Sequence, residues 1–301
     1  MYCVDAATLG RNGIACLNAA VAPARAGRAP SVLAILRALR ASVSRFIGQI
    51  FLAAGEGLTN GEDAVHLVIA PQSAYASLAE DTGILSAAER ETAARHRRGE
   101  DAERYRASRV LLRTALSTLM SGGIAPRDWR FEASGHGKPV LAPEQANAHF
   151  NISHTEAGLA VALSRAPVGV DIEDLSRPVD PCLYDTMLTP AERREICRKA
   201  AGSRSRHFMK LWAMKEAYAK LLGLGHTLDF AKIEVSLTKA RVVRDGNFAP
   251  DVSKALSRSI RFRTFSWKPE RKEQWVAIAL EAPGHGRTHV RTSILPASPQ
   301  L

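Results

Sequence analysis

The sequence is poor in the residues that mark several common protein classes. Only four of its 301 residues are cysteine, and none stands in a C-x-x-C pair or another zinc-binding spacing. These cysteines indicate free thiols in a reducing compartment. No long apolar run is free of arginine, and no cleavage pattern of a secretory signal follows an apolar core. We therefore expect a cytoplasmic protein without a membrane span.

Acidic residues are absent from Ala6 to Gly55, a stretch that carries six arginines. Within it, Ser31 to Leu52 is amphipathic. A targeting peptide, a helix lying on a surface and an accessory extension all remain open, and we assign residues 1–60 no function. The composition changes at Asp63, so we expect the globular part to begin near residue 61.

The overall composition is that of a globular protein with an excess of positive charge. The chain is 46% hydrophobic and 24% charged, with 41 Lys and Arg against 30 Asp and Glu, a net charge of +11. Such a balance favours anionic partners, namely nucleic acid, a membrane surface, a phosphorylated cofactor or an acidic protein.

Two parts of the chain repeat a coarse order of elements. In the first, 61–175, Ser86 and Glu89 predict a capped helix start, a helical region extends to Met120, and short strands follow. In the second, 176–284, Thr189 and Glu192 predict a similar start before a long helix and further strands. We expect an α+β fold of two similar halves in a pseudo-two-fold arrangement, with the active site at their junction and residues 285–301 as a tail.

The most informative stretch is the predicted helix from His207 to Gly225. Glu216 and Lys220 stand one turn apart on one face, which in isolation would indicate an exposed ion pair. Upstream, GVDIED predicts a strand on which Asp171 and Glu173 share a face. Neighbouring carboxylates repel unless they are exposed or share a cation. Together with Glu216 they would form a three-carboxylate site suited to Mg²⁺ carrying a diphosphate.

Other polar residues interrupt the pattern of apolar strands. Ser153 and His154 lie in a strand region, where a lone histidine is more often structural than a ligand contact. Lys138 follows a glycine-flanked turn. A basic cluster, Arg95, Arg97 and Arg98, has a solvated helix end as its simplest interpretation.

Four motifs occur together in a characteristic order. They are GKP at 137–139, FNISHT at 150–155, GVDIED at 169–174 and WAMKEAYAK at 212–220. With them the chain resembles the 4′-phosphopantetheinyl transferases of the surfactin-synthetase-activating type, over roughly Asp63 to Leu280. The resemblance implies a monomer that is pseudo-dimeric, with two similar halves in one chain. It also implies an enzyme that moves the 4′-phosphopantetheine arm of coenzyme A onto a serine of an apo carrier protein and releases adenosine 3′,5′-bisphosphate. The reaction would use Mg²⁺ or Mn²⁺.

The resemblance also implies roles for individual residues. Asp171, Glu173 and Glu216 would bind the metal, Glu216 would also accept the serine proton, and Lys220 would stabilise or protonate the leaving phosphate. The residues implied to bind coenzyme A are Lys215 at a phosphate, Ser153 and His154 at the 3′-phosphate, Lys138 beside the adenine, and Arg98 at a further phosphate.

The rival class is a basic nucleic-acid-binding protein, or a metal-dependent phosphodiesterase that would share the carboxylates. Against it stand the low aromatic content of 6% and the lack of a nucleic-acid-binding motif. The sequence does not name the carrier. Acyl, peptidyl and aryl carriers all present a serine on an acidic helix, which a basic surface would attract.

Overall fold

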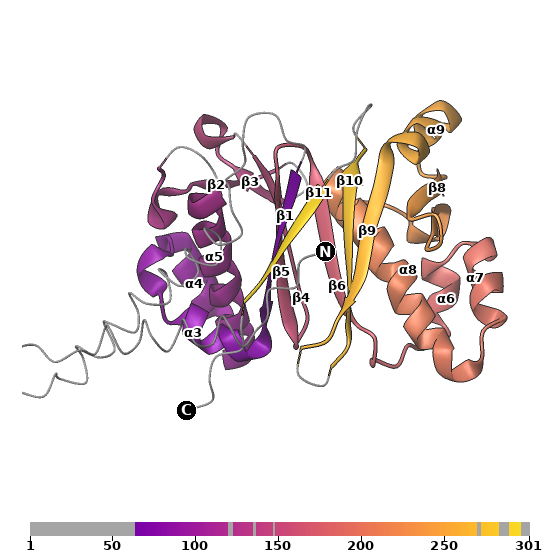
Figure 1. Cartoon of the computed structure of the whole chain (residues 1–301), viewed down its shortest axis with the longest axis horizontal. Helices are drawn as coiled ribbons and strands as arrows, with labels where there is room; N and C mark the ends of the chain where they lie inside the picture. Colours follow the sequence, from indigo (N-terminus) through magenta and orange to yellow (C-terminus); the bar gives the residue numbers. More distant parts are fainter. Residues whose placement is uncertain are drawn as a thin grey trace, which may run out of the picture. The chain divides into compact units, whose positions relative to one another are not determined.

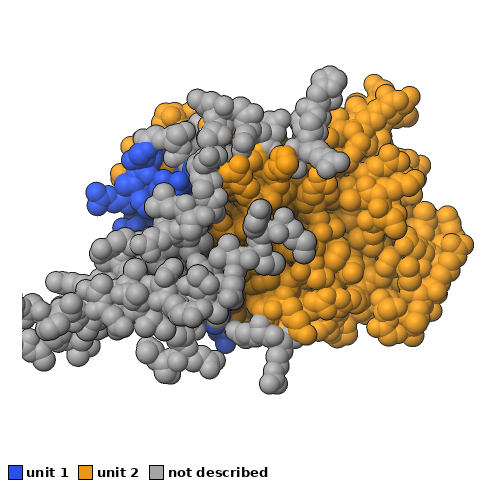
Figure 2. Space-filling view, in the orientation of Figure 1, with its two compact units in different colours: residues 1–57, 73–127, 295–301 blue, residues 58–72, 128–294 orange. Residues whose placement is uncertain are grey.

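The computed structural model describes residues 64–119, 123–134, 137–146, 148–269, 272–282 and 289–295. Residues 1–60, to which we assigned no function, lie outside the described residues. The chain divides into two compact units, residues 1–57, 73–127 and 295–301 in one, and 58–72 and 128–294 in the other (Figure 2). The division of the chain into halves 61–175 and 176–284 stays a prediction. Helices and antiparallel sheets coexist, so the predicted α+β class is confirmed.

The described part of the first unit is helical. It contains α3 (Tyr75–Ala79), α4 (Ala87–Arg95) and α5 (Gly99–Leu119), with short 3₁₀ turns at Gln72–Ala74, Thr82–Ile84 and Pro126–Asp128. Ser86 and Glu89 form the predicted capping box. The predicted helical region from Leu85 to Met120 is two helices, and the basic cluster lies around their junction. The buried residues of α5 include Val110, Leu111, Leu112, Ala115, Leu116 and Leu119.

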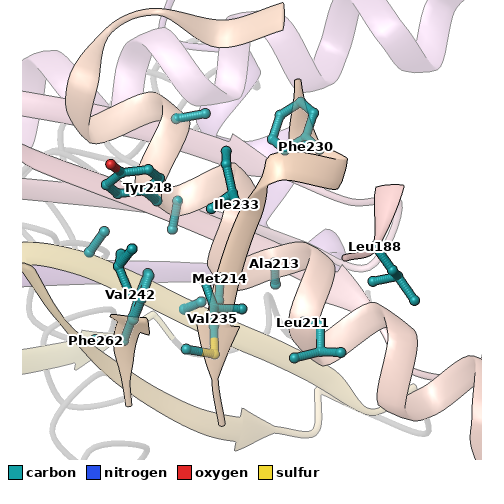
Figure 3. Close-up of a cluster of buried hydrophobic side chains, with 14 of the residues drawn as sticks. Leu188, Leu211, Ala213, Met214, Tyr218, Phe230, Ile233, Val235, Val242 and Phe262 are labelled. Carbon is teal, nitrogen blue, oxygen red and sulfur yellow. The ribbon is translucent and has the colours of Figure 1, made fainter. Parts of the chain in front are cut away.

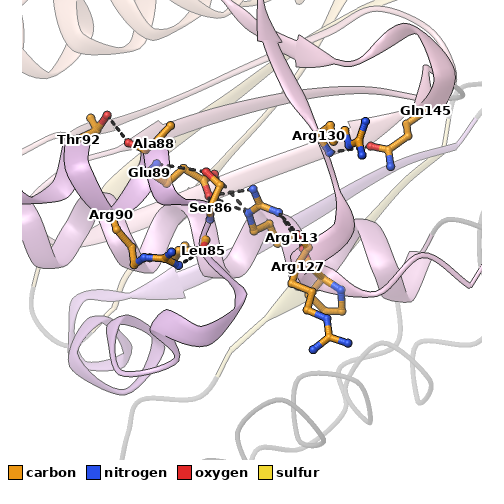
Figure 4. Close-up of polar contacts among 11 residues, drawn as sticks. Leu85, Ser86, Ala88, Glu89, Arg90, Thr92, Arg113, Arg127, Arg130 and Gln145 are labelled. Atoms are coloured by element: carbon orange, nitrogen blue, oxygen red, sulfur yellow. Dashed lines mark hydrogen bonds and ion pairs between the residues drawn. The ribbon is translucent and has the colours of Figure 1, made fainter.

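Inside this unit the capping glutamate is also one half of a buried ion pair. Arg113 of α5 is 1% exposed and donates from Nε to Oε2 of Glu89 at 3.0 Å (Figure 4). The same guanidinium donates to the carbonyl of Pro126 at 2.9 Å. The pair therefore ties the start of α4 to the middle of α5 and to the segment that follows it.

The second unit contains the sheets (Figure 1). One has the order β11-β1-β5-β4, in which β1 and β11 are parallel and the other pairs antiparallel. The strands are β11 (His289–Ile294), β1 (Ala64–Pro71), β5 (Gly158–Ser164) and β4 (His149–His154). No element was expected in residues 285–301, yet β11 falls there.

The other large sheet is antiparallel, with the order β6-β10-β9-β8-β7. Its strands are β6 (Val168–Asp174), β10 (Gln274–Glu281), β9 (Ile260–Trp267), β8 (Arg241–Asp245) and β7 (Ile233–Ser236). A separate hairpin pairs β2 (Phe131–Ala133) with β3 (Pro139–Leu141), and a 3₁₀ turn follows at Pro143–Gln145. Apolar side chains of β1, β5, β6 and β10 form one buried cluster, so the two large sheets pack on each other.

Four helices accompany the second sheet. They are α6 (Leu183–Met187), α7 (Pro190–Cys197), α8 (Ala201–Leu222) and α9 (Pro250–Ser259), with 3₁₀ turns at Gly225–Thr227 and Phe230–Lys232. Thr189 and Glu192 form the predicted capping box of α7. None of the described helices is both long and apolar enough to cross a bilayer.

Helix α8 is the predicted central helix, and it begins earlier than the sequence indicated. It starts at Ala201 rather than His207 because Ala201 to Arg206 contains no proline to stop it. It ends at Gly223, which caps it at φ +72°, a conformation that favours glycine. It packs on β6, β10 and β7. Its side chains Leu211, Met214 and Tyr218 belong to a buried apolar cluster that also contains residues of β7, β8 and β9 (Figure 3).

Candidate functional site

The candidate site forms where β6 lies against α8. Strand alternation sends Val170 and Ile172 into the apolar cluster between the sheets. Asp171 and Glu173 therefore occupy the opposite face of β6, as predicted. Gly169 lies on that face too, and an added Cβ there would stand 1.9 Å from the carbonyl oxygen of Ala217 in α8. The missing side chain lets the helix approach the strand, which brings Lys220 to Asp171.

An ion pair connects the two elements directly. Nζ of Lys220 lies 2.5 Å from Oδ1 of Asp171 and 3.0 Å from Oγ of Ser153. Asp171 is 3% exposed, while the Lys220 side chain is 26% exposed. The bland alternative from the sequence, an exposed ion pair between Glu216 and Lys220, does not describe this arrangement, because the ammonium of Lys220 contacts a buried carboxylate on the strand.

The three predicted carboxylates act on one another electrostatically. Burial, and next the negative charge of Asp171, raise the pKa of Glu173 to about 8, and Glu216 contributes in the same direction. Burial is also the main cause that raises the pKa of Glu216; Lys220 lowers it and Asp171 raises it. Two neighbouring carboxyl groups with raised pKa values, Glu173 and Glu216, are an arrangement that a bound cation would stabilise.

Carboxylate oxygens without a hydrogen-bond partner indicate whether Asp171, Glu173 and Glu216 fit a metal. Oδ2 of Asp171 is buried and has no hydrogen-bond partner. Among the described residues no group of three His, Cys, Asp or Glu side chains is already arranged around a common metal position. Instead, the ammonium of Lys220 neutralises Asp171. The donor set, oxygen ligands with one orphaned carboxylate oxygen, fits a hard divalent cation such as Mg²⁺.

Ser153 faces Asp171, and its contact with the 3′-phosphate stays a prediction. Its hydroxyl donates to Oδ1 of Asp171 at 2.7 Å. The neighbouring His154 is exposed at the end of β4. Asn151, on the same side of β4 as Ser153, accepts a hydrogen bond from the N–H of Val170 at 2.8 Å. No role was predicted for Asn151 from the sequence.

Lys138 comes from the hairpin between β2 and β3, where Gly137 has φ +79°. Its ammonium donates to the carbonyl of Lys220 at 2.6 Å, at the carboxyl end of α8. A cation at this end of a helix is favourable because unpaired carbonyls concentrate negative charge there. Burial lowers the pKa of Lys138. Its predicted place beside an adenine stays a prediction, while its observed contact holds the end of the helix that carries Lys220.

Lys215 does not point toward the candidate site, which corrects the prediction that it contacts a phosphate. It is fully buried and donates to Glu192 at 2.6 Å, to the carbonyl of Met187 at 2.8 Å and to that of Phe230 at 2.9 Å. An ammonium has three donors, and all three are used. Burial lowers its pKa, and Glu192 opposes that shift. The sequence contains one signal for this role of Lys215, namely the capping-box residue Glu192, because a glutamate that becomes buried needs a cation.

Arg98, the last predicted contact, belongs to the first unit. Its side chain is exposed, and its carbonyl accepts from the N–H of Ala102 at 3.2 Å as α5 begins. The exposed helix junction agrees with the simpler of the two interpretations of the basic cluster. A contact between Arg98 and a phosphate stays a prediction.

Comparison with known proteins identifies the family. A model described as "4'-phosphopantetheinyl transferase, N-terminal" matches residues 71–165, and one described as "4'-phosphopantetheinyl transferase superfamily" matches residues 167–279. The chain belongs to the 4′-phosphopantetheinyl transferase superfamily, and its relatives place it with the Sfp type, as the four motifs predicted.

Curated relatives agree with this assignment. The chain is 33% identical to 4′-phosphopantetheinyl transferase ffp of Bacillus subtilis and 31% identical to 4′-phosphopantetheinyl transferase Sfp of Bacillus subtilis strain 168, over 51% of this chain and 66% of each relative. The chain thus spans slightly less than two thirds of the length of these relatives. A solved structure titled "Chronobacterium ammoniagenes ACPS-CoA complex" is 23% identical over 38% of this chain and 97% of that chain, with a TM-score of 0.27.

Proposed function

We propose that this protein transfers the 4′-phosphopantetheine arm of coenzyme A to a serine hydroxyl of an apo carrier protein, giving the holo carrier and adenosine 3′,5′-bisphosphate. Membership of the family supports the reaction class. The observation that carries the proposal to this chain is the meeting of Asp171, Glu173, Glu216 and Lys220 where β6 lies against α8.

The residues suit the chemistry of attack by an alcohol on a diphosphate. The serine oxygen forms a bond to the phosphorus that bears the pantetheine arm, and the bond from that phosphorus to the nucleotide phosphate breaks. Glu216 would accept the serine proton, directly or through a water. Burial raises the pKa of Glu216, and a more basic carboxylate is a better proton acceptor. Lys220, one turn further along α8, would stabilise or protonate the departing phosphate.

Asp171, Glu173 and Glu216 would hold Mg²⁺, which neutralises the charge of the diphosphate oxygens when bound. The ammonium of Lys220 contacts Oδ1 of Asp171 and compensates the charge of this buried carboxylate. Ser153 would hold β6 and α8 together through Asp171 and Lys220, and Lys138 would hold the carboxyl end of α8.

The partner class follows from the reaction and from charge. A carrier that presents its serine on an acidic helix would be attracted by a chain with a net charge of +11. We expect the enzyme to act as a monomer in the cytoplasm. Loading of individual apo carriers decides whether the substrate is an acyl, peptidyl or aryl carrier.

Mass spectrometry of candidate apo carriers tests the proposal. Each carrier is incubated with the protein, coenzyme A and Mg²⁺, and the expected product is a carrier with one phosphopantetheine on serine. Reactions without coenzyme A, and with Asp171→Ala in place of the wild-type protein, should leave the carriers unmodified. If coenzyme A with Mg²⁺ has no effect on the melting temperature while an oligonucleotide raises it, the nucleic-acid-binding class is correct instead.

A further inference from the structure

Two sheet edges meet beside the candidate site without pairing as strands. In the described part of the chain β4 is the last strand of one sheet and β6 the first strand of the other, and no ladder joins them. Antiparallel pairing with β10 satisfies only alternate N–H groups of β6. The N–H groups of Val170 and Ile172 would be left buried and unpaired, which is costly in a protein interior.

Side chains of β4 replace the missing ladder. Asn151 Oδ1 accepts from the N–H of Val170 at 2.8 Å, and Ser153 Oγ accepts from the N–H of Ile172 at 3.4 Å. Both side chains are buried, at 8% and 6% exposure. They stand two residues apart, so strand alternation sends both toward β6. Their spacing matches that of the two N–H groups they satisfy.

Ser153 differs from Asn151 because it also contacts the candidate catalytic groups. Its hydroxyl donates to Oδ1 of Asp171 at 2.7 Å and accepts from Nζ of Lys220 at 3.0 Å. A serine hydroxyl has one donor and two acceptor positions, and these three contacts occupy all of them. No hydrogen-bonding capacity is left on this side chain for the 3′-phosphate of a ligand.

We propose that Ser153 is a positioning residue that fixes the carboxylate of Asp171, the ammonium of Lys220 and the edge of β6 at once, rather than a contact of the 3′-phosphate. Asn151, two residues earlier in β4, binds the N–H of Val170 on the same edge of β6 and makes no hydrogen bond to Asp171 or Lys220. Asn151 is therefore the matched control within the same strand.

Amide hydrogen exchange measured by NMR tests the structural part without any substrate or metal. In Ser153→Ala the exchange rate of the Ile172 amide should rise by about tenfold or more, while that of Val170 stays within about twofold. Asn151→Ala should give the reverse pattern. Unchanged protection of Ile172 in Ser153→Ala would overturn the proposal.

The claim that Ser153 does not contact the 3′-phosphate is tested with coenzyme A and 3′-dephospho-coenzyme A as a matched pair of ligands. The accompanying measurement of kcat rests on the proposed transfer. We expect Ser153→Ala to keep the wild-type ratio of the two dissociation constants within about twofold, while kcat falls about tenfold or more, because an interaction that orders the reacting groups is lost. A ratio that collapses toward one would show that Ser153 contacts the 3′-phosphate and would overturn the proposal.

Two further variants separate loss of the hydroxyl from loss of folding. Ser153→Thr and Ser153→Val have nearly the same shape, and only threonine keeps the hydroxyl. Greater Ile172 protection and greater stability in Ser153→Thr than in Ser153→Val support the proposal, also when Ser153→Ala does not fold. Equal behaviour of the two contradicts it. If the wild-type protein transfers no arm to any carrier, the proposed function fails, and the exchange measurements still decide the role of Ser153.

Discussion

Substitution of Gly169 by alanine tests how the strand and helix are held together. The new Cβ would stand 1.9 Å from the carbonyl oxygen of Ala217 and 2.5 Å from the amide nitrogen of Leu221. Both are backbone atoms of α8, so no side chain can rotate away. Ordinary contact begins near 3.4 Å. The helix must therefore move by about 1.5 Å, or β6 must bend.

The expected cost follows from that movement. Overpacking of a well-packed core destabilises by about 1–3 kcal/mol. For a domain of this size, each kcal/mol lowers the melting temperature by roughly 2–4 °C, so we expect a loss of about 2–12 °C. Because the helix carries Glu216 and Lys220, the same shift displaces both from Asp171. A misplacement of about 1 Å can lower a rate by about 10²-fold, and we expect that scale of loss in kcat.

Differential scanning calorimetry and a carrier-loading assay measure the two effects. Gly202→Ala is the matched control, since Gly202 lies in the same helix and an added Cβ there meets no atom within 4 Å. That variant should be as stable as the wild type or more stable, by up to about 1 kcal/mol. If Gly169→Ala matches Gly202→Ala in both assays, the close approach of β6 and α8 is not what positions the site.

Three further predictions follow from the charged groups. Lys215→Met leaves the buried Glu192 without its cation and should destabilise by about 3–5 kcal/mol. The affinity for coenzyme A should stay within about twofold, which isothermal titration calorimetry can check. Without Mg²⁺, Glu173→Gln should raise the melting temperature more at pH 9 than at pH 5. The folded protein keeps a proton on Glu173 up to about pH 8, which the unfolded chain releases near 4.5, so wild-type stability falls as pH rises through that window; a pH-independent difference would contradict this. Lys220→Met should keep affinity for coenzyme A while kcat falls by about 10²-fold or more; an equal loss of affinity would make Lys220 a ground-state phosphate contact.

The features that could be predicted from the sequence are those set by local periodicity. Strand alternation placed Asp171 and Glu173 on one face, and the structure has them there because Val170 and Ile172 fill the opposite, apolar face. Likewise, a side chain that returns to its own backbone three residues away is a local interaction, so both capping boxes could be predicted.

The features that could not be predicted depend on partners far apart in the chain. Ser153 meets Ile172 and Lys220 only after two sheets and a helix have packed, and its polarity alone suits a ligand contact as well as a structural one. The parallel pairing of β11 with β1 joins residues more than two hundred positions apart, for which no local pattern exists. The role of Lys138 at the end of α8 was hidden for the same reason.

Lys215 shows how two adjacent residues of one motif come to serve different purposes. Successive residues of a helix point about 100° apart, so Lys215 and Glu216 cannot both face β6. Glu192, buried at the start of α7, needs a cation, and Lys215 supplies it. The same solution occurs in the first unit, where buried Glu89 at the start of α4 pairs with Arg113 of α5. Each capping glutamate thus pairs with a cation on the long helix that follows. This packing explains the lysine of K-E within WAMKEAYAK, and Glu216 and Lys220 are the residues of that motif that we propose act on a substrate.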